Sequence, residues 1–170
     1  MAAAYGLKQV KGAECISDKL WIGLALGVYV QPTDAQIGKL LRSSDPLVRR
    51  ETVRHYAADA DFIEKSLTNP SPKGYALRLD VVLCQKLTAE QAAKVLDEAL
   101  MRGNVAMLWA LLENRMAPLD VEQLYSVISN MEERMSFGQG APSRYEGIRK
   151  AALWRLGDAY AKEADPTGSD

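Results

Sequence analysis

The chain has 170 residues, of which 48% are hydrophobic, and this is enough for the core of one domain of ordinary size. Its 21 basic and 22 acidic side chains give a net charge of −1, so the whole molecule lacks the strongly positive field typical of nucleic-acid-binding proteins. Its two cysteines, Cys15 and Cys84, form no disulfide framework and suit a reducing compartment, so we expect a cytoplasmic protein.

The N-terminal residues 1–16 show no clean hydrophobic period, and we expect a loosely ordered arm there. They lack the charged start and apolar core of a secretory signal. The apolar run 20–30 is shorter than the roughly 20 residues that span a bilayer, so we interpret it as a buried helix and expect no membrane contact. Residues 17–163 are predicted to form one helical-repeat domain, followed by a disordered tail at 164–170.

The sequence after Pro32 contains several residue patterns that predict the start of a helix. Thr33 with Gln36 three residues later forms the pattern of a capping box. Asp45 can cap a helix whose first residue is Pro46, where the missing backbone N–H costs nothing. A shorter helix is predicted over 60–67. The stripe expected to be buried on the Asp45 helix consists of Leu47, Val48, Thr52, Val53 and Tyr56.

The next two helices differ in character. Ser71 can cap a helix that has Pro72 at its first position. The run 75–86 is expected to be the central helix, with nearly every residue buried except Arg78 and Asp80. Thr88 then opens an amphipathic helix with Gln91 in the capping-box position. Gly103 ends that helix.

Three more helices follow. Asn104 starts a strongly apolar one, in which Trp109 is predicted to lie in the core. Asp120, with a glutamine three residues later, starts a helix that reaches about residue 135. Residues 136–142 have loop composition and are either a plain connector or a functional loop. Ser143 and Glu146 form the last predicted capping box.

Two types of helix therefore alternate along the sequence, one capped and amphipathic and the other more uniformly apolar. Stacked helix pairs would place them in separate layers, whereas a plain helical bundle would leave their alternation accidental. The paired Asp-Pro and Ser-Pro starts favour the stack. We expect an all-α fold, a short right-handed α-solenoid of about eight or nine helices.

One family resemblance rests on two short motifs. Asp45-Pro46-x-Val48-Arg49-Arg50 resembles the repeat of leucine-rich repeat variant and HEAT-like helical-repeat proteins, and residues 69–72, Asn-Pro-Ser-Pro, resemble their Asn-Pro turn. The resemblance is specific over 45–83 and loose over 33–156. It implies an α-solenoid with a binding surface but no particular catalytic residue. Some variant-repeat proteins are associated with a cysteine-ligated cluster, but two cysteines do not support one here, so no cofactor is expected.

The sequence contains no recognisable catalytic or metal-binding motif. His55 is the only histidine, and no nucleophile or acid is placed beside it by spacing, so a structural histidine is expected. One histidine and two distant cysteines do not form a zinc motif. The sequence contains no phosphate-binding glycine loop or paired-acid signature. We therefore predict a protein that is not an enzyme and binds no metal.

Charge is unevenly distributed along the chain. Residues 39–78 contain eight basic and five acidic side chains, whereas residues 87–135 contain four basic and eight acidic ones. Arg50 and Arg54 share one helix face, with Arg49 beside them, and Arg78 belongs to the same basic half. These four arginines either are solvated surface residues with Glu51 and Asp59 as local partners, or bind an acidic protein or a phosphate backbone. We call Arg49, Arg50 and Arg54 the arginine ridge.

Function is predicted from these surfaces. Trp154 lies off the apolar stripe of its helix and either caps the core or anchors a partner. The favoured hypothesis is a protein-binding module of the adaptor, inhibitor or immunity type, with an acidic partner steered by the arginine ridge. The alternative is a nucleic-acid-binding or DNA-processing protein, because a DNA-glycosylase family also uses a HEAT-like stack. Asp80 is then the best candidate for a catalytic carboxylate.

Overall fold

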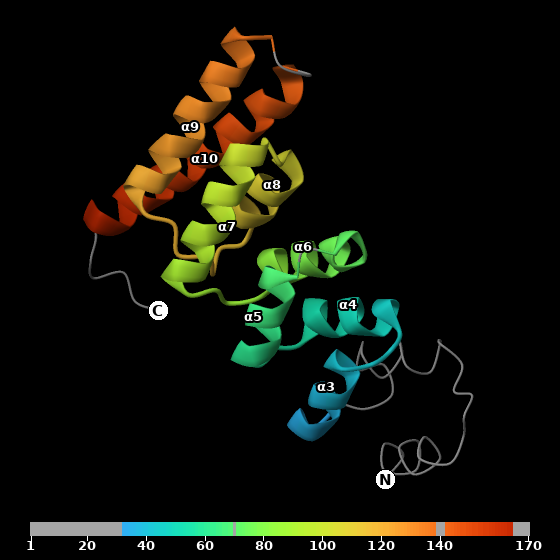
Figure 1. Cartoon of the computed structure of the whole chain (residues 1–170). Coiled ribbons are helices and arrows are strands. Elements are labelled where there is room, and N and C mark those ends of the chain that lie inside the picture. The colour runs from blue at the N-terminus through green and yellow to red at the C-terminus, as the bar shows by residue number, and fades with distance from the viewer. Residues whose placement is uncertain (1–31, 70, 139–141, 165–170) are drawn as a thin grey trace, which may run out of the picture. The chain divides into compact units, whose positions relative to one another are not determined.

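The computed structural model describes residues 32–69, 71–138 and 142–164. Within these ranges every regular element is helical, with eight α-helices and one short 3₁₀ helix, which confirms the predicted all-α class (Figure 1). The apolar run 20–30, the N-terminal arm and the tail beyond residue 164 lie outside the described residues. None of the described helices combines the length and apolarity needed to cross a bilayer.

The chain divides into two compact units, Met1–Gln85 and Lys86–Asp170. In the first unit α3 packs on α4, and α4 and α5 both pack on α6 (Figure 1). Its core contains fully buried valines from α4 and α6, because both helices turn their β-branched residues inward. The helices of this unit are α3 (Asp34–Leu41), α4 (Pro46–His55), α5 (Ala60–Thr68), η1 (Pro72–Gly74) and α6 (Tyr75–Cys84).

In the second unit α7 packs on α8 and α9, and α10 packs on α8 and α9. Figure 1 shows α9 and α10 running side by side along much of their length. Leu108, Leu111, Leu124, Met131 and Ile148 are its largest fully buried side chains. The helices of this unit are α7 (Ala89–Arg102), α8 (Val105–Glu113), α9 (Val121–Ser136) and α10 (Pro142–Ala164).

Most predicted helix starts are confirmed. Asp45 caps α4, where its Oδ1 accepts the Leu47 amide at 2.8 Å, and Pro46 is the first helical residue. Thr33, Thr88 and Asp120 form reciprocal capping boxes at the starts of α3, α7 and α9. Each cap satisfies a backbone N–H that the first turn leaves without a partner, so local sequence alone fixes these boundaries.

Two predicted starts are wrong. Helix α10 already begins at Pro142, so Ser143 is a helical residue and does not cap it. Ser71 and Pro72 lead into the 3₁₀ turn η1, in which the Gly74 amide donates to the Ser71 carbonyl at 2.8 Å, and α6 begins only at Tyr75. Proline at the first turn fits both outcomes, since a 3₁₀ turn and an α-helix tolerate its missing N–H equally.

Burial corrects three predictions about side chains. Trp109 is 43% exposed and is not a core residue, because α7 and α10 leave part of α8 uncovered. Leu47 is 44% exposed, since it lies in the first turn of α4 and away from the Val48 and Val53 stripe. Asp80 was expected on the exposed side of α6, but it is only 3% exposed. Its carboxylate lies where α6 packs on α4.

Candidate functional site

Helix α4 carries all three arginines of the arginine ridge. Arg50 and Arg54 are four residues apart and project from the same face of this helix, toward α6. Asp80 lies on the facing side of α6. The packing of α4 on α6 therefore brings a buried carboxylate to two guanidinium groups that the sequence suggests are surface residues.

Asp80 accepts hydrogen bonds from both arginines. Its Oδ2 accepts Nε of Arg50 at 2.5 Å, and its Oδ1 accepts Nε and Nη2 of Arg54 at 3.1 and 2.9 Å. Arg54 also donates to Glu51 one turn earlier, at 2.8 Å. Both carboxylate oxygens of Asp80 are thus engaged, which is how a buried carboxylate avoids the cost of an uncompensated charge.

Electrostatics follow from this arrangement. The hydrogen bonds that Arg54 donates to Asp80 raise the pKa of Arg54, against the opposing effect of partial burial. The side chain of Asp80 is 4% exposed, while those of Arg50 and Arg54 are 32% and 38% exposed. The two arginines therefore present part of each guanidinium to solvent, with much of their charge neutralised by Asp80 and Glu51. Asp80 itself is placed as a structural anion and not as a free general base.

The remaining predicted arginines have different surroundings. Arg49 donates through Nη1 to the Ser43 carbonyl and forms no ion pair with any described residue. Arg78 is half-buried on α6, two residues before Asp80. Asp59, expected as a partner of the ridge, pairs instead with Arg42 at 3.0 Å and caps α5. Of the three ridge arginines, Arg49 alone keeps a positive charge with no acidic partner among the described residues.

The second predicted contact residue is Trp154 on α10. It is 70% exposed, so it does not cap the core of its unit. The Arg115 guanidinium lies 5.2 Å from the centroid of the Trp154 ring, a cation–π distance, and Arg115 also pairs with Asp158 one turn further along α10. The indole is thus held by a neighbouring side chain while most of its surface remains exposed.

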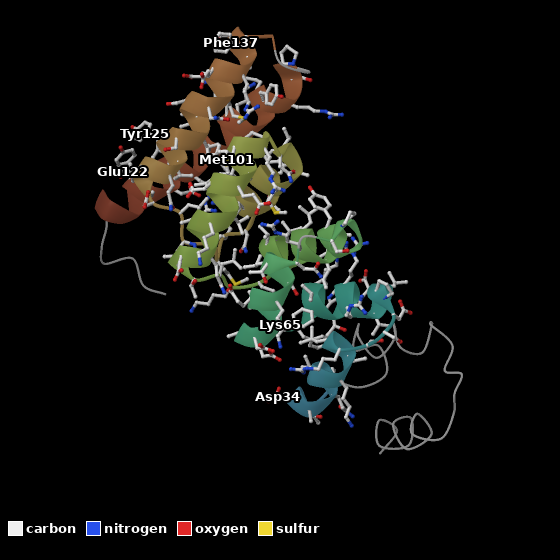
Figure 2. All side chains as sticks on the ribbon, in the orientation of Figure 1. Asp34, Lys65, Met101, Glu122, Tyr125 and Phe137 are labelled. Carbon is white, nitrogen blue, oxygen red and sulfur yellow. The ribbon has the colours of Figure 1, made fainter. Side chains whose placement is uncertain are left out.

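Other exposed apolar side chains of the second unit were not predicted. Tyr125 on α9 and Tyr160 on α10 are 48% and 47% exposed, and their hydroxyls lie 3.3 Å apart. Figure 2 shows Tyr125 and Phe137 toward opposite ends of α9. Phe137 is 69% exposed and follows the last residue of α9. Helical periodicity does not distinguish the buried centre of an apolar stripe from its exposed margin, and these residues lie at the margin.

His55 and Cys84 are two reactive side chains of the first unit. His55 is half-exposed on α4, with Nε2 3.8 Å from the Glu51 carboxylate. Cys84 is a partly buried free thiol, and burial, followed by the nearby charge of Asp80, raises its pKa. Among the residues that the structure describes, no group of three or more His, Cys, Asp and Glu side chains could hold a metal ion.

Sequence reasoning missed the role of Asp80, although a signal was present. Asp80 is an acidic residue within an otherwise apolar helix, and ionised carboxylates are almost never buried unless paired. The same signal does not reveal which arginines pair with it, since that depends on how α4 packs on α6. Comparison of the chain with protein-family models, curated proteins and solved structures finds no match. The helical-repeat resemblance therefore remains a prediction.

Proposed function

We propose that the chain is a non-enzymatic protein-binding module, built as a short right-handed α-solenoid of the leucine-rich repeat variant or HEAT-like type. Helix packing supports the solenoid, because α3 pairs with α4, α5 with α6, α7 with α8 and α9 with α10. In the first unit the two pairs are joined by the contact of α4 with α6. In the second unit they are joined by the contacts of α7 with α9 and of α8 with α10. Links between helices two apart are what stacked pairs require.

The observation that carries the binding function is the exposed Trp154. A tryptophan that is 70% exposed costs hydrophobic free energy in the isolated protein, and burial against a partner recovers it. Arg115 and Asp158 restrict its motion before binding, which lowers the entropy lost on association. Tryptophan and arginine are also the side chains most enriched at the centres of protein interfaces. Trp154 is accordingly the proposed partner anchor.

Charged side chains on both units would orient the partner and raise the rate at which it associates. In the second unit Asp97, Glu113, Glu122 and Glu133 form no ion pair with another described residue, so the acidic half keeps a net negative charge. Figure 2 shows Glu122 beside Tyr125, at one end of α9. In the first unit Arg49 supplies uncompensated positive charge, and Arg50, Arg54 and Arg78 are the further proposed contacts for an acidic patch.

A protein partner is favoured over nucleic acid by the pairing at Asp80. A phosphate backbone is bound by several guanidinium or ammonium groups that are free to replace its counterions. Arg50 and Arg54 already share one carboxylate, and Arg54 has Glu51 as a second partner. Within the arginine ridge this leaves Arg49 and the Nη groups of Arg50 as available donors, which is fewer than an extended phosphate backbone requires. We propose a cytoplasmic adaptor, inhibitor or immunity-type protein that acts through these surfaces.

Site-specific photocrosslinking in the native host tests the proposed anchor. A benzophenone amino acid is placed at position 154, and in a separate variant at Met101, which is 80% exposed on α7 and serves as the control. We expect one discrete crosslinked protein from position 154 and none in common with position 101. Identical or diffuse products from the two positions would contradict an interface at Trp154.

A titration of labelled duplex and single-stranded DNA separates the two classes of partner. The wild-type chain and an Arg49→Glu variant are compared at low and near-physiological salt, since Arg49 can be reversed without removing an ion pair. We expect no saturable binding. Binding of about micromolar affinity that weakens steeply with salt and is lost in the variant would establish the nucleic-acid function instead.

A further inference from the structure

A cavity of about 550 Å³ opens within the first unit, between the end of α3, helices α4 and α5, and the start of α6. Pockets that hold small molecules fall in the range of roughly 300–1,000 Å³, so this one is large enough for a ligand. All of its lining residues belong to the first unit, whereas Trp154 belongs to the second. The chemistry of its lining is what indicates the kind of ligand.

Four positively charged side chains line this pocket, and no described lining residue is acidic. They come from three places in the unit, namely the end of α3, helix α4 and helix α5. Like charges that converge on a cavity repel one another, and an anion placed among them relieves that repulsion. The four residues are Arg42, Arg49, Arg50 and Lys65.

Three of the four cations keep donors that a ligand can use. Arg50 uses only Nε for Asp80, and neither of its Nη groups bonds to another described residue. Arg49 uses Nη1 for the Ser43 carbonyl and has no carboxylate partner among these residues. Lys65 pairs with Asp61 at 2.7 Å, but both side chains are largely exposed, so the pair is weak and can exchange. Figure 2 shows Lys65 on α5.

The remainder of the lining is partly apolar and partly uncharged. Phe62 of α5 and Leu77 of α6 supply apolar surface. Ser66 is only 7% exposed and also lines the cavity, and its hydroxyl bonds to no other described residue. A ligand would therefore meet cationic donors and a hydroxyl on some walls and hydrocarbon on others. An inorganic ion would leave the apolar walls uncovered, whereas an uncharged hydrophobe would leave the spare guanidinium donors of Arg49 and Arg50 unused.

We infer that this pocket binds a small organic molecule in which a phosphoryl group is attached to an aromatic or aliphatic group. Arginine is the side chain best matched to the oxygens of a phosphoryl group, through two parallel N–H donors. A dianion also suits the excess of cationic groups better than a single carboxylate does. The apolar group of the ligand contacts Phe62 and Leu77, and the phosphoryl group contacts Arg49 and Arg50.

The test uses the full chain labelled with ¹⁵N and four probes: phenyl phosphate, inorganic phosphate, benzoate and phenol. Amide chemical shifts are followed to about 10 mM of each probe, a range that detects millimolar affinity. We expect saturable shifts of pocket residues with phenyl phosphate, weaker binding of inorganic phosphate and of benzoate, and no saturable binding of phenol. No saturable binding of phenyl phosphate overturns the proposal. Inorganic phosphate that binds as tightly as phenyl phosphate overturns the role of the apolar walls.

Two variants locate the binding. Arg49→Gln should weaken phenyl phosphate binding about tenfold, which corresponds to the loss of one charge-assisted hydrogen bond. Lys65→Gln removes only an exposed pair, so it keeps the fold, and it should weaken binding about threefold. Arg144→Gln is the matched control, because Arg144 is exposed on α10 and forms no interaction with another described residue. Equal affinities of both pocket variants and the wild-type chain would overturn the proposal.

Discussion

The Asp80 carboxylate of α6 accepts two hydrogen bonds from the Arg54 guanidinium of α4, at 2.9 and 3.1 Å. It accepts a third from Arg50 on its other oxygen. Two helices that are separated in the chain by α5 are thus joined through one buried anion. The arginine ridge is therefore also a structural device, because removing Asp80 would leave two guanidinium groups packed beside each other without their shared partner.

Asp80→Asn is expected to lower the free energy of unfolding by about 2–3 kcal/mol. The amide has nearly the same shape as the carboxylate but loses its charge, and its NH₂ group faces donors instead of acceptors. The loss stays below that of a fully buried pair, because both arginines are partly exposed. Urea unfolding followed by circular dichroism measures the change.

The control for Asp80→Asn is the same substitution at Asp97, which is exposed on α7 and has no partner among the described residues. It should change the unfolding free energy by less than about 0.5 kcal/mol. Equal effects at the two positions would show that Asp80 contributes nothing specific. An Asp80→Asn protein as stable as the wild type would lead to the same conclusion.

Gly103 and Gly157 allow a matched test of backbone conformation. Gly103 ends α7 with φ of 61°, and a Cβ there would lie 2.7 Å from Nη1 of Arg134. Gly103→Ala should therefore cost about 1–2 kcal/mol. Gly157 lies within α10, and a Cβ there would meet nothing within 4 Å. Gly157→Ala should instead stabilise the protein by about 0.5–1 kcal/mol. Thermal unfolding of both variants should give shifts of Tm in opposite directions, and shifts of the same sign would contradict the argument.

Local sequence was sufficient for helix boundaries wherever a side chain caps its own helix. Asp45, Thr88 and Asp120 each bond to an amide two or three residues later, so no tertiary information is needed. Ser143 shows the limit of that reasoning, because a serine followed by a glutamate three residues later fits a helix start as well as a first-turn position. A competing proline at 142 decided between them.

Predicting the candidate sites needed tertiary information that the sequence does not contain. The spacing of Arg50 and Arg54 correctly indicates a shared face, but only the packing of α4 on α6 identifies Asp80 as their partner. The exposure of Trp154 and Trp109 is likewise not predictable from the sequence, because it depends on which side of each helix the neighbouring helices leave uncovered. A pattern of periodicity predicts that a helix has a buried side but not how wide that side is.

Asp59 should make stability depend on pH in the acid range. Its carboxylate accepts the Phe62 amide at 2.8 Å and pairs with Arg42, and these contacts, the amide first, lower its pKa in the folded protein. A depressed pKa stabilises the folded state above the unfolded value near pH 4, and this stabilisation is lost as pH falls through the folded value. Asp59→Asn keeps a good helix cap but does not titrate. The difference in unfolding free energy between wild type and variant should therefore shrink as pH falls from about 6 to below 3. A difference that stays constant over that range would contradict this assignment.

Arg155 of α10 is expected to be the most important single side chain for the end of α8. Its Nη1 donates to the carbonyls of Leu111 and Asn114 at 2.9 and 3.1 Å, and its Nη2 donates to the Ala117 carbonyl at 2.8 Å. These carbonyls lie in the last turn of α8 and the loop after it. Those of Asn114 and Ala117 also accept backbone amides of the loop, at 3.0 Å each, whereas Arg155 is the one described donor to the Leu111 carbonyl. Burial, and next the charge of Arg115, lowers the pKa of Arg155, but a guanidinium remains charged at neutral pH.

Arg155→Met should lower the free energy of unfolding by about 2–4 kcal/mol, because it removes three charge-assisted hydrogen bonds and leaves the Leu111 carbonyl without a donor among the described residues. Arg155→Lys should recover only part of this, since one ammonium group cannot reproduce the planar fork that spans them. Arg144→Met, on the same helix but exposed and without a partner among the described residues, should change it by less than about 0.5 kcal/mol. Urea unfolding gives the energies, and amide hydrogen exchange should show faster exchange confined first to the segment after α8. If Arg155→Lys matches the wild type in both measurements, the positive charge alone holds this segment and the fork geometry does not matter.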